Sequence, residues 1–293
     1  MGTPAVDCVL DIRAELGECP TWSVREQALY WIDIYPGLLN RFDPATGANR
    51  VWKLPEPIGS FALCEDGAVL LALKSGLWRY DLGSEALTPL ARPEPDLPGN
   101  RLNDGRCDPR GRFWVGSMED PVRPERAMGA LYRFGADHRC ARLVDGLFVS
   151  NGLAFSPDAR TLYHSDSYAA VRTIWAWDFD ADDGSIRNRR VFVDTAGMPG
   201  RPDGGACDAD GCYWMAGNDG WEIVRFTPHG AIDRRIAVPV AKPSMIAFGG
   251  PRLDTIYITS IRPASVDGQP QAGSLFAVHA GGITGIAEPL FTG

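Results

Sequence analysis

Acidic and amide side chains recur at one position of a pattern that repeats along this chain. Glu18, Asn151 and Asp203 each stand at the start of a copy, ahead of a turn and an aromatic segment. Carboxylate and carboxamide oxygens are the ligands that hard divalent cations prefer. Because three protein ligands leave coordination positions for water and substrate, the set predicts an open cation site of the kind that Lewis-acid catalysis uses.

Two further residues extend the predicted site. Asn103 occupies the same position in another copy, and Arg101, two residues earlier, falls on the same face of a strand. A guanidinium at that point would hold a polar or anionic substrate. The two remaining copies carry residues 58–60 and Ser244 at this position.

A simpler interpretation is that these residues only form tight turns. Asp and Asn next to Gly are common in tight turns, so each of these residues taken alone indicates a turn. Their recurrence at one repeat position favours a shared site, and Glu18 adds weight because a lone carboxylate in an apolar context is costly without a partner. By contrast, the acidic segments that begin at Asp108 and Asp208 are predicted to be ordinary hairpin turns.

The elements that must position these side chains are strands. Six copies of the pattern are present, and their second strands begin near Tyr30, Leu70, Phe113, Tyr163, Tyr213 and Tyr257. A spacing of about 40 to 50 residues is typical of propeller blades, and apolar and polar residues alternate with the period of a strand rather than a helix. Two more strands follow in each copy.

The predicted fold is therefore all-β, a six-bladed β-propeller of four-stranded blades forming a single domain over residues 1–293. The N-terminal segment, residues 6–12, has no copy of its own. We expect it to pair with the last blade and close the ring, which removes the free edges of an open sheet.

Composition argues against several classes of partner. A formal net charge of −8 offers no basic surface for nucleic acid or an anionic membrane. No apolar run approaches the roughly 20 residues of a membrane helix, and no secretory signal is visible. The seven cysteines are odd in number and never spaced C-x-x-C, which favours buried, reduced thiols in a cytoplasmic protein. Nucleophile-elbow, Walker A and dinucleotide-binding motifs are absent, and His164 is expected to be structural.

The sequence resembles the regucalcin, senescence-marker-protein and gluconolactonase family. The resemblance runs along nearly the whole chain and rests on six ordered motifs: L-G-E-x-P at 16–20, R-x-N-D-G at 101–105, D-P-x-G-R at 108–112, G-[ST]-M at 116–118, S-N-G-L at 150–153 and P-D-G at 202–204. It implies a six-bladed propeller that binds one divalent cation in its central channel and hydrolyses sugar lactones.

The resemblance also implies roles for individual residues. Glu18, Asn151 and Asp203 match the metal ligands of the family, and Asp203 is the candidate general base. Arg101 and Asn103 match its substrate-binding positions. The family usually places an acidic residue shortly after G-[ST]-M. Here Glu119 and Asp120 both follow, in a shifted register, so either is a candidate for holding the sugar hydroxyls.

Several alternatives stay open from the sequence. The cation could be Ca, Zn, Mn, Mg or Fe(II), because carboxylates and carboxamides do not choose strongly among them. The partner is expected to be a small sugar lactone of unspecified identity, and the sequence gives no oligomeric state. Since a fold does not fix a substrate, the same site would also suit a metal-dependent organophosphate or ester hydrolase, or a non-catalytic calcium-binding regulatory protein.

Overall fold

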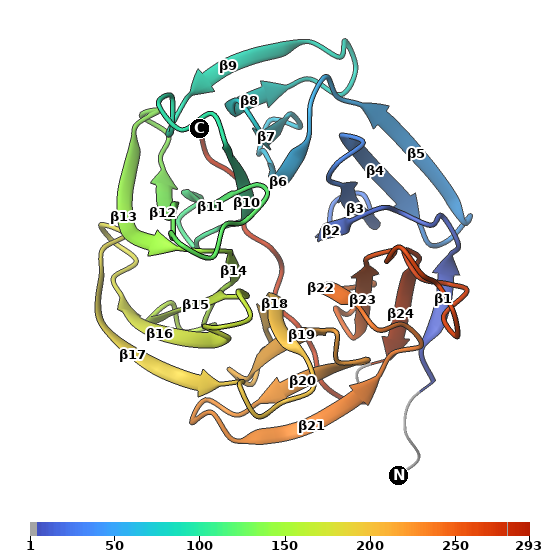
Figure 1. Ribbon diagram of the computed structural model, residues 1–293. Coiled ribbons are helices and arrows are strands. Elements are labelled where there is room, and N and C mark those ends of the chain that lie inside the picture. Colours follow the sequence, from blue (N-terminus) through green and yellow to red (C-terminus); the bar gives the residue numbers. More distant parts are fainter. Residues whose placement is uncertain (1–4, 280) are drawn as a thin grey trace.

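A computed structural model of the chain describes residues 5–279 and 281–293, and all the regular elements in them are strands. The strands form six four-stranded antiparallel sheets arranged as the blades of a ring around a central channel (Figure 1). The predicted six-bladed β-propeller is thereby confirmed. Residues 1–4, the start of the segment searched for a secretory signal, lie outside the described residues.

Each blade is built from the channel outwards. The inner strands are β2 (Gly17–Ser23), β6 (Ile58–Leu63), β10 (Asn100–Cys107), β14 (Ser150–Phe155), β18 (Arg201–Cys207) and β22 (Pro243–Gly249). The second strands are β3 (Ala28–Asp33), β7 (Val69–Leu73), β11 (Phe113–Glu119), β15 (Thr161–Asp166), β19 (Tyr213–Asn218) and β23 (Thr255–Ser260).

The outer half of each blade is more exposed. The third strands are β4 (Leu38–Asp43), β8 (Gly76–Tyr80), β12 (Gly129–Phe134), β16 (Thr173–Phe179), β20 (Glu222–Phe226) and β24 (Leu275–His279). The outermost strands are β5 (Ala48–Lys53), β9 (Leu87–Ala91), β13 (Cys140–Leu147), β17 (Ile186–Asp194), β21 (Ile232–Ala237) and β1 (Asp7–Leu10).

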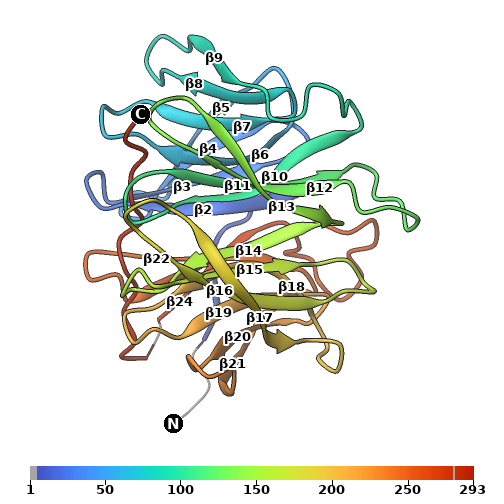
Figure 2. The same cartoon turned by 90° about the vertical axis from the view of Figure 1, so that its left-hand side faces the viewer.

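The ring closes where the first strand of the chain joins the last blade. Strand β1 pairs antiparallel with β24, so the sixth blade is completed by the N-terminal segment, as predicted. This pairing removes a free sheet edge and ties the first blade to the last. The side view in Figure 2 shows the outer strands wrapping around the ring.

Aromatic side chains join neighbouring blades. Trp114 in β11 meets Phe155 of the next inner strand edge-on, with ring centroids 5.7 Å apart, and Trp214 in β19 meets Phe248 in the same way at 6.0 Å. Both tryptophans are fully buried. Because such contacts bury large apolar areas and favour specific ring geometries, they fix the angle between blades.

Each inner strand carries an irregularity in its pairing. In four blades the register shifts just after a predicted site residue or beside it, between Glu18 and Thr21, Leu102 and Gly105, Asn151 and Ala154, and Pro202 and Gly205. A bulge bends a strand locally and re-aims its side chains. The shift recurs in all six inner strands, and in four of them it adjoins a predicted site residue.

One end of the channel is covered by the C-terminal segment, which Figure 1 shows crossing behind the inner strands. Phe291 forms a bridge with Cys64, and Gly285 forms one with Asp208. Beneath the channel, Glu288 of this segment forms an ion pair with the buried Arg106 at 2.8 Å. The C-terminal segment is thus held across this end of the channel.

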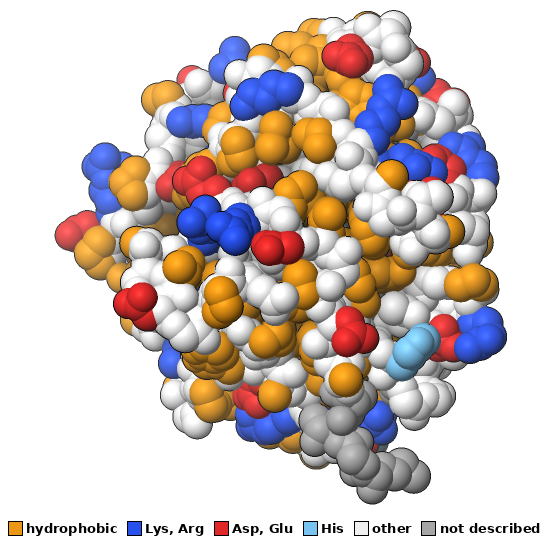
Figure 3. All heavy atoms as spheres, turned by 90° about the vertical axis from the view of Figure 1, so that its right-hand side faces the viewer, with side chains coloured by type: hydrophobic (Ala, Val, Ile, Leu, Met, Phe, Trp, Pro, Cys, Tyr) orange, Lys and Arg blue, Asp and Glu red, His pale blue; other side chains and the backbone are white. Residues whose placement is uncertain are grey.

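The side of the ring that lies to the right in Figure 1 is chemically mixed. Figure 3 shows acidic, basic and hydrophobic side chains interspersed on it. Within the described ranges, no helix has the length and hydropathy needed to cross a membrane.

Candidate active site

Three of the predicted site residues lie at one end of the channel. All blades have the same antiparallel order, so their inner strands begin at the same end, opposite the C-terminal segment (Figure 1). Glu18, Asn151 and Asp203 occupy the first three positions of their strands and are 8%, 5% and 5% exposed. A Cβ atom at Gly152, beside Asn151, would lie 3.2 Å from the carbonyl oxygen of Asp203.

A directional chain of hydrogen bonds connects three blades here. Arg101 Nη1 donates to Asn103 Oδ1 at 2.6 Å, and Asn103 Nδ2 donates to Asn151 Oδ1 at 3.1 Å. Asn151 Nδ2 then donates to Ser167 Oγ at 2.7 Å, and Ser167 donates to the carbonyl oxygen of Pro202. Since a guanidinium only donates, the chain fixes both amides and leaves a lone pair of Asn151 Oδ1 for a ligand.

The two acidic residues lack cationic partners. Glu18 Oε2 accepts a hydrogen bond from the backbone nitrogen of Cys19 at 3.1 Å, and Asp203 Oδ2 accepts one from Asn218 Nδ2 at 2.6 Å. Within the described residues neither carboxylate forms an ion pair with Lys or Arg.

Burial governs the titration of this pair. Burial, followed by the negative charges of Asp203 and Asp104, raises the pKa of Glu18 well above its usual value. Burial also raises the pKa of Asp203 to about 7, against the opposing effect of the Asn218 hydrogen bond. A cation bound between the two carboxylates would stabilise their ionised forms and so lower both pKa values.

The residues present suit a hard divalent cation. Two carboxylates without a counter-charge and one amide oxygen form an all-oxygen donor set. No group of three or more His, Cys, Asp or Glu side chains in the described part of the chain is arranged to hold a metal ion. The candidate set therefore combines Glu18 and Asp203 with the amide of Asn151, and its use as a ligand set stays a prediction.

The chain entering two of these strands is held by aspartates that the sequence analysis did not single out. Asp33, at the end of β3, accepts hydrogen bonds from the backbone nitrogens of Glu15 and Leu16 at 3.0 and 2.9 Å. Asp166, at the end of β15, does the same for Phe148 and Val149 at 2.8 and 3.1 Å. The available signal was that the segments ALYWID and TLYHSD both end in Asp.

The mouth of the site distinguishes the two acidic candidates that follow Met118. Asp120 Oδ2 accepts a hydrogen bond from Arg101 Nε at 2.8 Å, so Asp120 lies beside the predicted substrate-binding arginine. Glu119 forms an ion pair with Arg126 instead, in the loop between β11 and β12. The arrangement favours Asp120 over Glu119 as the acid nearest a bound substrate.

Comparison with known families gives the family of this chain. Residues 16–262 match the family model described as SMP-30/Gluconolactonase/LRE-like region. The chain belongs to the SMP-30/gluconolactonase family. The family expected from the sequence motifs is confirmed.

Individual relatives of this SMP-30/gluconolactonase family member cover nearly its whole length. A 6-deoxy-6-sulfogluconolactonase from Pseudomonas putida is 42% identical over 290 residues, 98% of each chain. An L-arabinolactonase from Azospirillum brasilense is 39% identical over 280 residues, 92% of this chain and 91% of the relative. The solved structure of a calcium-binding protein, regucalcin, from Agrobacterium tumefaciens has a TM-score of 0.92 at 30% identity and 99% coverage of both chains. Two of the three are named as lactonases, in agreement with the predicted class of enzyme.

Buried polar groups support the site of this SMP-30/gluconolactonase family member from behind. Asp104 Oδ2 accepts a hydrogen bond from the backbone nitrogen of Leu153 at 2.8 Å, and burial raises the pKa of Asp104 to about 6. His164 Nε2 lies 2.9 Å from Ser150 Oγ, and burial lowers the pKa of His164 to about 3. His164 is therefore neutral and structural, as expected. All seven cysteines are free thiols, as expected, but only five are buried, because Cys8 and Cys140 lie on outermost strands and are partly exposed.

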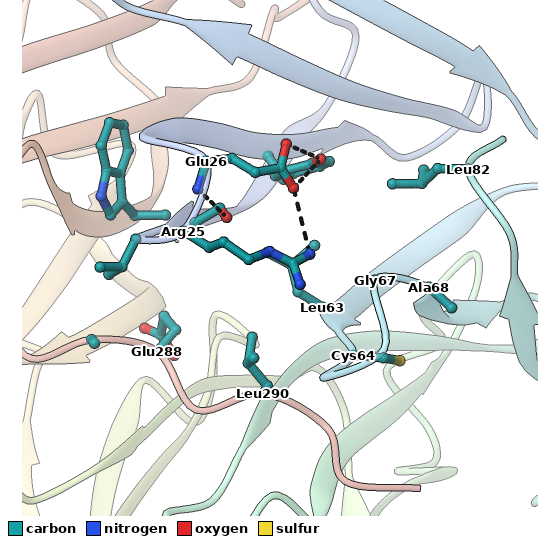
Figure 4. A pocket seen from close by; sticks show the side chains of 14 residues that line it. Arg25, Glu26, Leu63, Cys64, Gly67, Ala68, Leu82, Glu288 and Leu290 are labelled. Atoms are coloured by element: carbon teal, nitrogen blue, oxygen red, sulfur yellow. Dashed lines mark hydrogen bonds and ion pairs between the residues drawn. The ribbon is translucent and has the colours of Figure 1, made fainter.

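A separate pocket lies where β2 and β6 end, away from the predicted site residues. Its volume is about 260 Å³, and Figure 4 shows Arg25 and Glu26 on one wall and Glu288 and Leu290 of the C-terminal segment on another. Glu26 accepts a hydrogen bond from Tyr30 and lies 3.9 Å from Arg25 in an ion pair. Since Glu18, Asn151 and Asp203 do not line it, this pocket is not part of the candidate active site.

Proposed function

We propose that this protein hydrolyses a sugar lactone to the corresponding aldonic acid with one divalent cation at the channel mouth. The observation that carries the proposal is the pair of buried carboxylates Glu18 and Asp203, neither of which forms an ion pair with Lys or Arg among the described residues. The amide of Asn151, held by Asn103, lies at the start of the inner strand of the blade next to that of Asp203. Names of the lactonase relatives supply the substrate class.

Glu18, Asn151 and Asp203 would hold the cation. When bound, it supplies Lewis-acid polarisation of the lactone carbonyl and offsets the two buried negative charges. The all-oxygen donor set suits Ca, Mg and Mn best, while Zn and Fe(II) stay candidates.

Asp203 is the proposed general base. Its Oδ2 is held by Asn218, which leaves Oδ1 to accept the proton of the attacking water. Without a bound cation, burial raises the pKa of Asp203 to about 7. A bound cation would lower this pKa, so the carboxylate would be deprotonated at neutral pH and able to accept a proton. The water oxygen bonds to the carbonyl carbon, the ring C–O bond breaks, and the released ring oxygen takes up a proton to become a hydroxyl.

Arg101, Asn103 and Asp120 are proposed to orient the sugar. Arg101 is held at Nε by Asp120 and at Nη1 by Asn103, so its plane is fixed before substrate arrives. Such preorganisation lowers the entropic cost of reaching the reactive geometry. Glu119, committed to Arg126, is the weaker candidate.

A non-catalytic calcium-binding role is the second candidate function. It is favoured by the regucalcin structure, which is described as a calcium-binding protein. An organophosphate or other ester hydrolase would use the same residues on a different electrophile.

One panel experiment separates these functions. The protein is stripped by chelation, reloaded with each of the five cations, and assayed on glucono-, galactono-, arabinono- and xylonolactone, on a 6-deoxy-6-sulfogluconolactone and on a paraoxon-type ester. We expect turnover of a sugar lactone that chelation abolishes and a divalent cation restores. Turnover that survives exhaustive chelation would refute the cation, and a cation-binding protein that turns over none of the lactones would refute lactone hydrolysis.

A further inference from the structure

Basic side chains gather on one side of the site mouth. Arg201 is the first residue of β18 and Lys242 directly precedes β22, so both stand where the inner strands of two adjacent blades begin. Their side chains are 30% and 24% exposed, which keeps them within reach of a solute while restricting their motion.

The positive charge on this side exceeds the negative charge paired with it. Arg201 Nη2 lies 2.9 Å from Asp219 Oδ2, and Lys242 pairs with the other oxygen of the same carboxylate. Arg172, in the loop after β15, donates only to the carbonyl oxygens of Met198 and Gly200, at 2.7 and 2.8 Å. Its Nε is buried and has no partner in the described residues. Arg201 and Lys242 thus share one carboxylate, and Arg172 forms no ion pair within the described residues.

The cationic side adjoins the proposed reaction centre. Arg201 Nη2 and Lys242 Nζ both donate to Asn218 Oδ1, at 3.4 and 3.3 Å, and Asn218 Nδ2 donates to Asp203 Oδ2 at 2.6 Å. A single amide side chain therefore separates the cations from the proposed base. A lactone that reacts at Asp203 and extends to this side would place its far end against Arg201 and Lys242.

On another side of the mouth, Arg101 is already paired. Arg101 has a carboxylate of its own in Asp120 and also donates to Asn103, so its charge and geometry are already matched. Arg201 and Lys242 are therefore better placed than Arg101 to bind an anion on the substrate.

We propose that Arg201 and Lys242 form a subsite for a tetrahedral anionic group, a sulfonate or a phosphate, on the lactone carbon farthest from the carbonyl. The proposal rests on the proposed function. Guanidinium and ammonium groups recognise such anions through charge-assisted hydrogen bonds. Arg172 adds to the positive potential that attracts the anion without contacting it.

A competing explanation is that the cations act only on Asp203, whose negative charge they stabilise. The two explanations differ in what they predict for neutral substrates. A cation that acts through Asp203 affects every lactone alike, whereas a subsite acts only on lactones that carry the anion.

The test compares kcat/KM of the cation-loaded protein for gluconolactone, 6-phosphogluconolactone and 6-deoxy-6-sulfogluconolactone. We expect at least one anionic lactone to exceed the neutral one by about 10-fold, and Lys242→Gln to lower that ratio by about 10-fold, mainly through KM. The two anionic arms tell phosphate from sulfonate. Arg252→Gln removes one positive charge from the turn between β22 and β23, where Arg252 pairs with Asp254, and should leave the ratio unchanged within about twofold.

Calorimetric binding of 6-phosphogluconate and gluconate gives a readout that does not require turnover. We expect the first to bind more tightly, and Lys242→Gln to remove the difference. A ratio near one in the unmodified protein, or an equal loss for neutral and anionic lactones in Lys242→Gln, would overturn the subsite. If no lactone is hydrolysed but 6-phosphogluconate still binds preferentially, the proposed function fails and the subsite stands.

Discussion

Two pairs of buried carboxylates in this propeller differ in the number of hydrogen-bond donors that surround them. Asp108 and Asp208 lie at the covered end of the channel and are fully buried. Asp208 accepts hydrogen bonds from two backbone nitrogens, from Trp214 Nε1 at 2.8 Å and from Arg225 Nε at 2.7 Å. Asp108 has the same set, with Trp114 and Arg112 in the equivalent roles.

Glu18 and Asp203 are nearly as buried as Asp108 and Asp208 but accept far fewer hydrogen bonds. Each accepts one hydrogen bond, and neither meets a guanidinium or ammonium group in the described chain. A buried charge that is fully paired holds its surroundings together, whereas one left unpaired is costly until a ligand arrives. We therefore expect Asp108 and Asp208 to serve stability, and Glu18 and Asp203 to serve binding and chemistry.

The largest effect is expected on activity at the open end. Asp203→Asn keeps the size of the side chain and its contact with Asn218 but removes the base and one negative charge. We expect kcat to fall by about 1,000-fold or more, equivalent to about 4 kcal/mol in the barrier. Because a buried charge is removed, the metal-free variant should unfold at the same or a higher urea concentration. A variant that retains more than a tenth of the turnover would remove Asp203 from the mechanism.

At the covered end the same substitution should act on stability. Asp208→Asn leaves the guanidinium of Arg225, a buried residue, without its closest counter-charge, although Arg225 also pairs with Asp210 and Asp233. We expect the free energy of unfolding to fall by about 3 kcal/mol. Urea unfolding measures this loss, and kcat per folded molecule should stay the same. Loss of activity without loss of stability would contradict the division between the two kinds of acid.

A smaller effect is expected on the pH dependence of stability. Burial raises the pKa of Asp203 from 3.8 to about 7 in the folded, cation-free protein, so the folded state binds more protons than the unfolded state between these values. The free energy of unfolding should therefore fall by a few kcal/mol as pH rises from about 4 to about 7. The raised pKa of Glu18 should add to this fall. Urea unfolding in chelator across this range measures the slope. Asp203→Asn should flatten it, and an unchanged slope in that variant would contradict the assignment.

Much of the fold and part of the site followed from local sequence. Period-two alternation and turn residues repeat in every blade, so the number of blades and strands was readable. Glu18, Asn103, Asn151 and Asp203 were identifiable because one repeat position converges on the axis of any propeller. Asp33, Asp166 and Asn218 were missed, since the end of a second strand reads as ordinary turn sequence until its hydrogen bonds are known.

The amino-acid sequence by itself determined the propeller, its family and the residue types that surround the channel, because these depend on patterns within each blade. Only the tertiary structure decided the partners of the charged groups. In the structure Arg101 pairs with Asp120 rather than with Glu119. Arg201 and Lys242 both pair with Asp219, and Glu288 pairs with Arg106. Pairings such as that of Glu288 with Arg106 join residues far apart in the chain, and their geometry is fixed only when the ring closes.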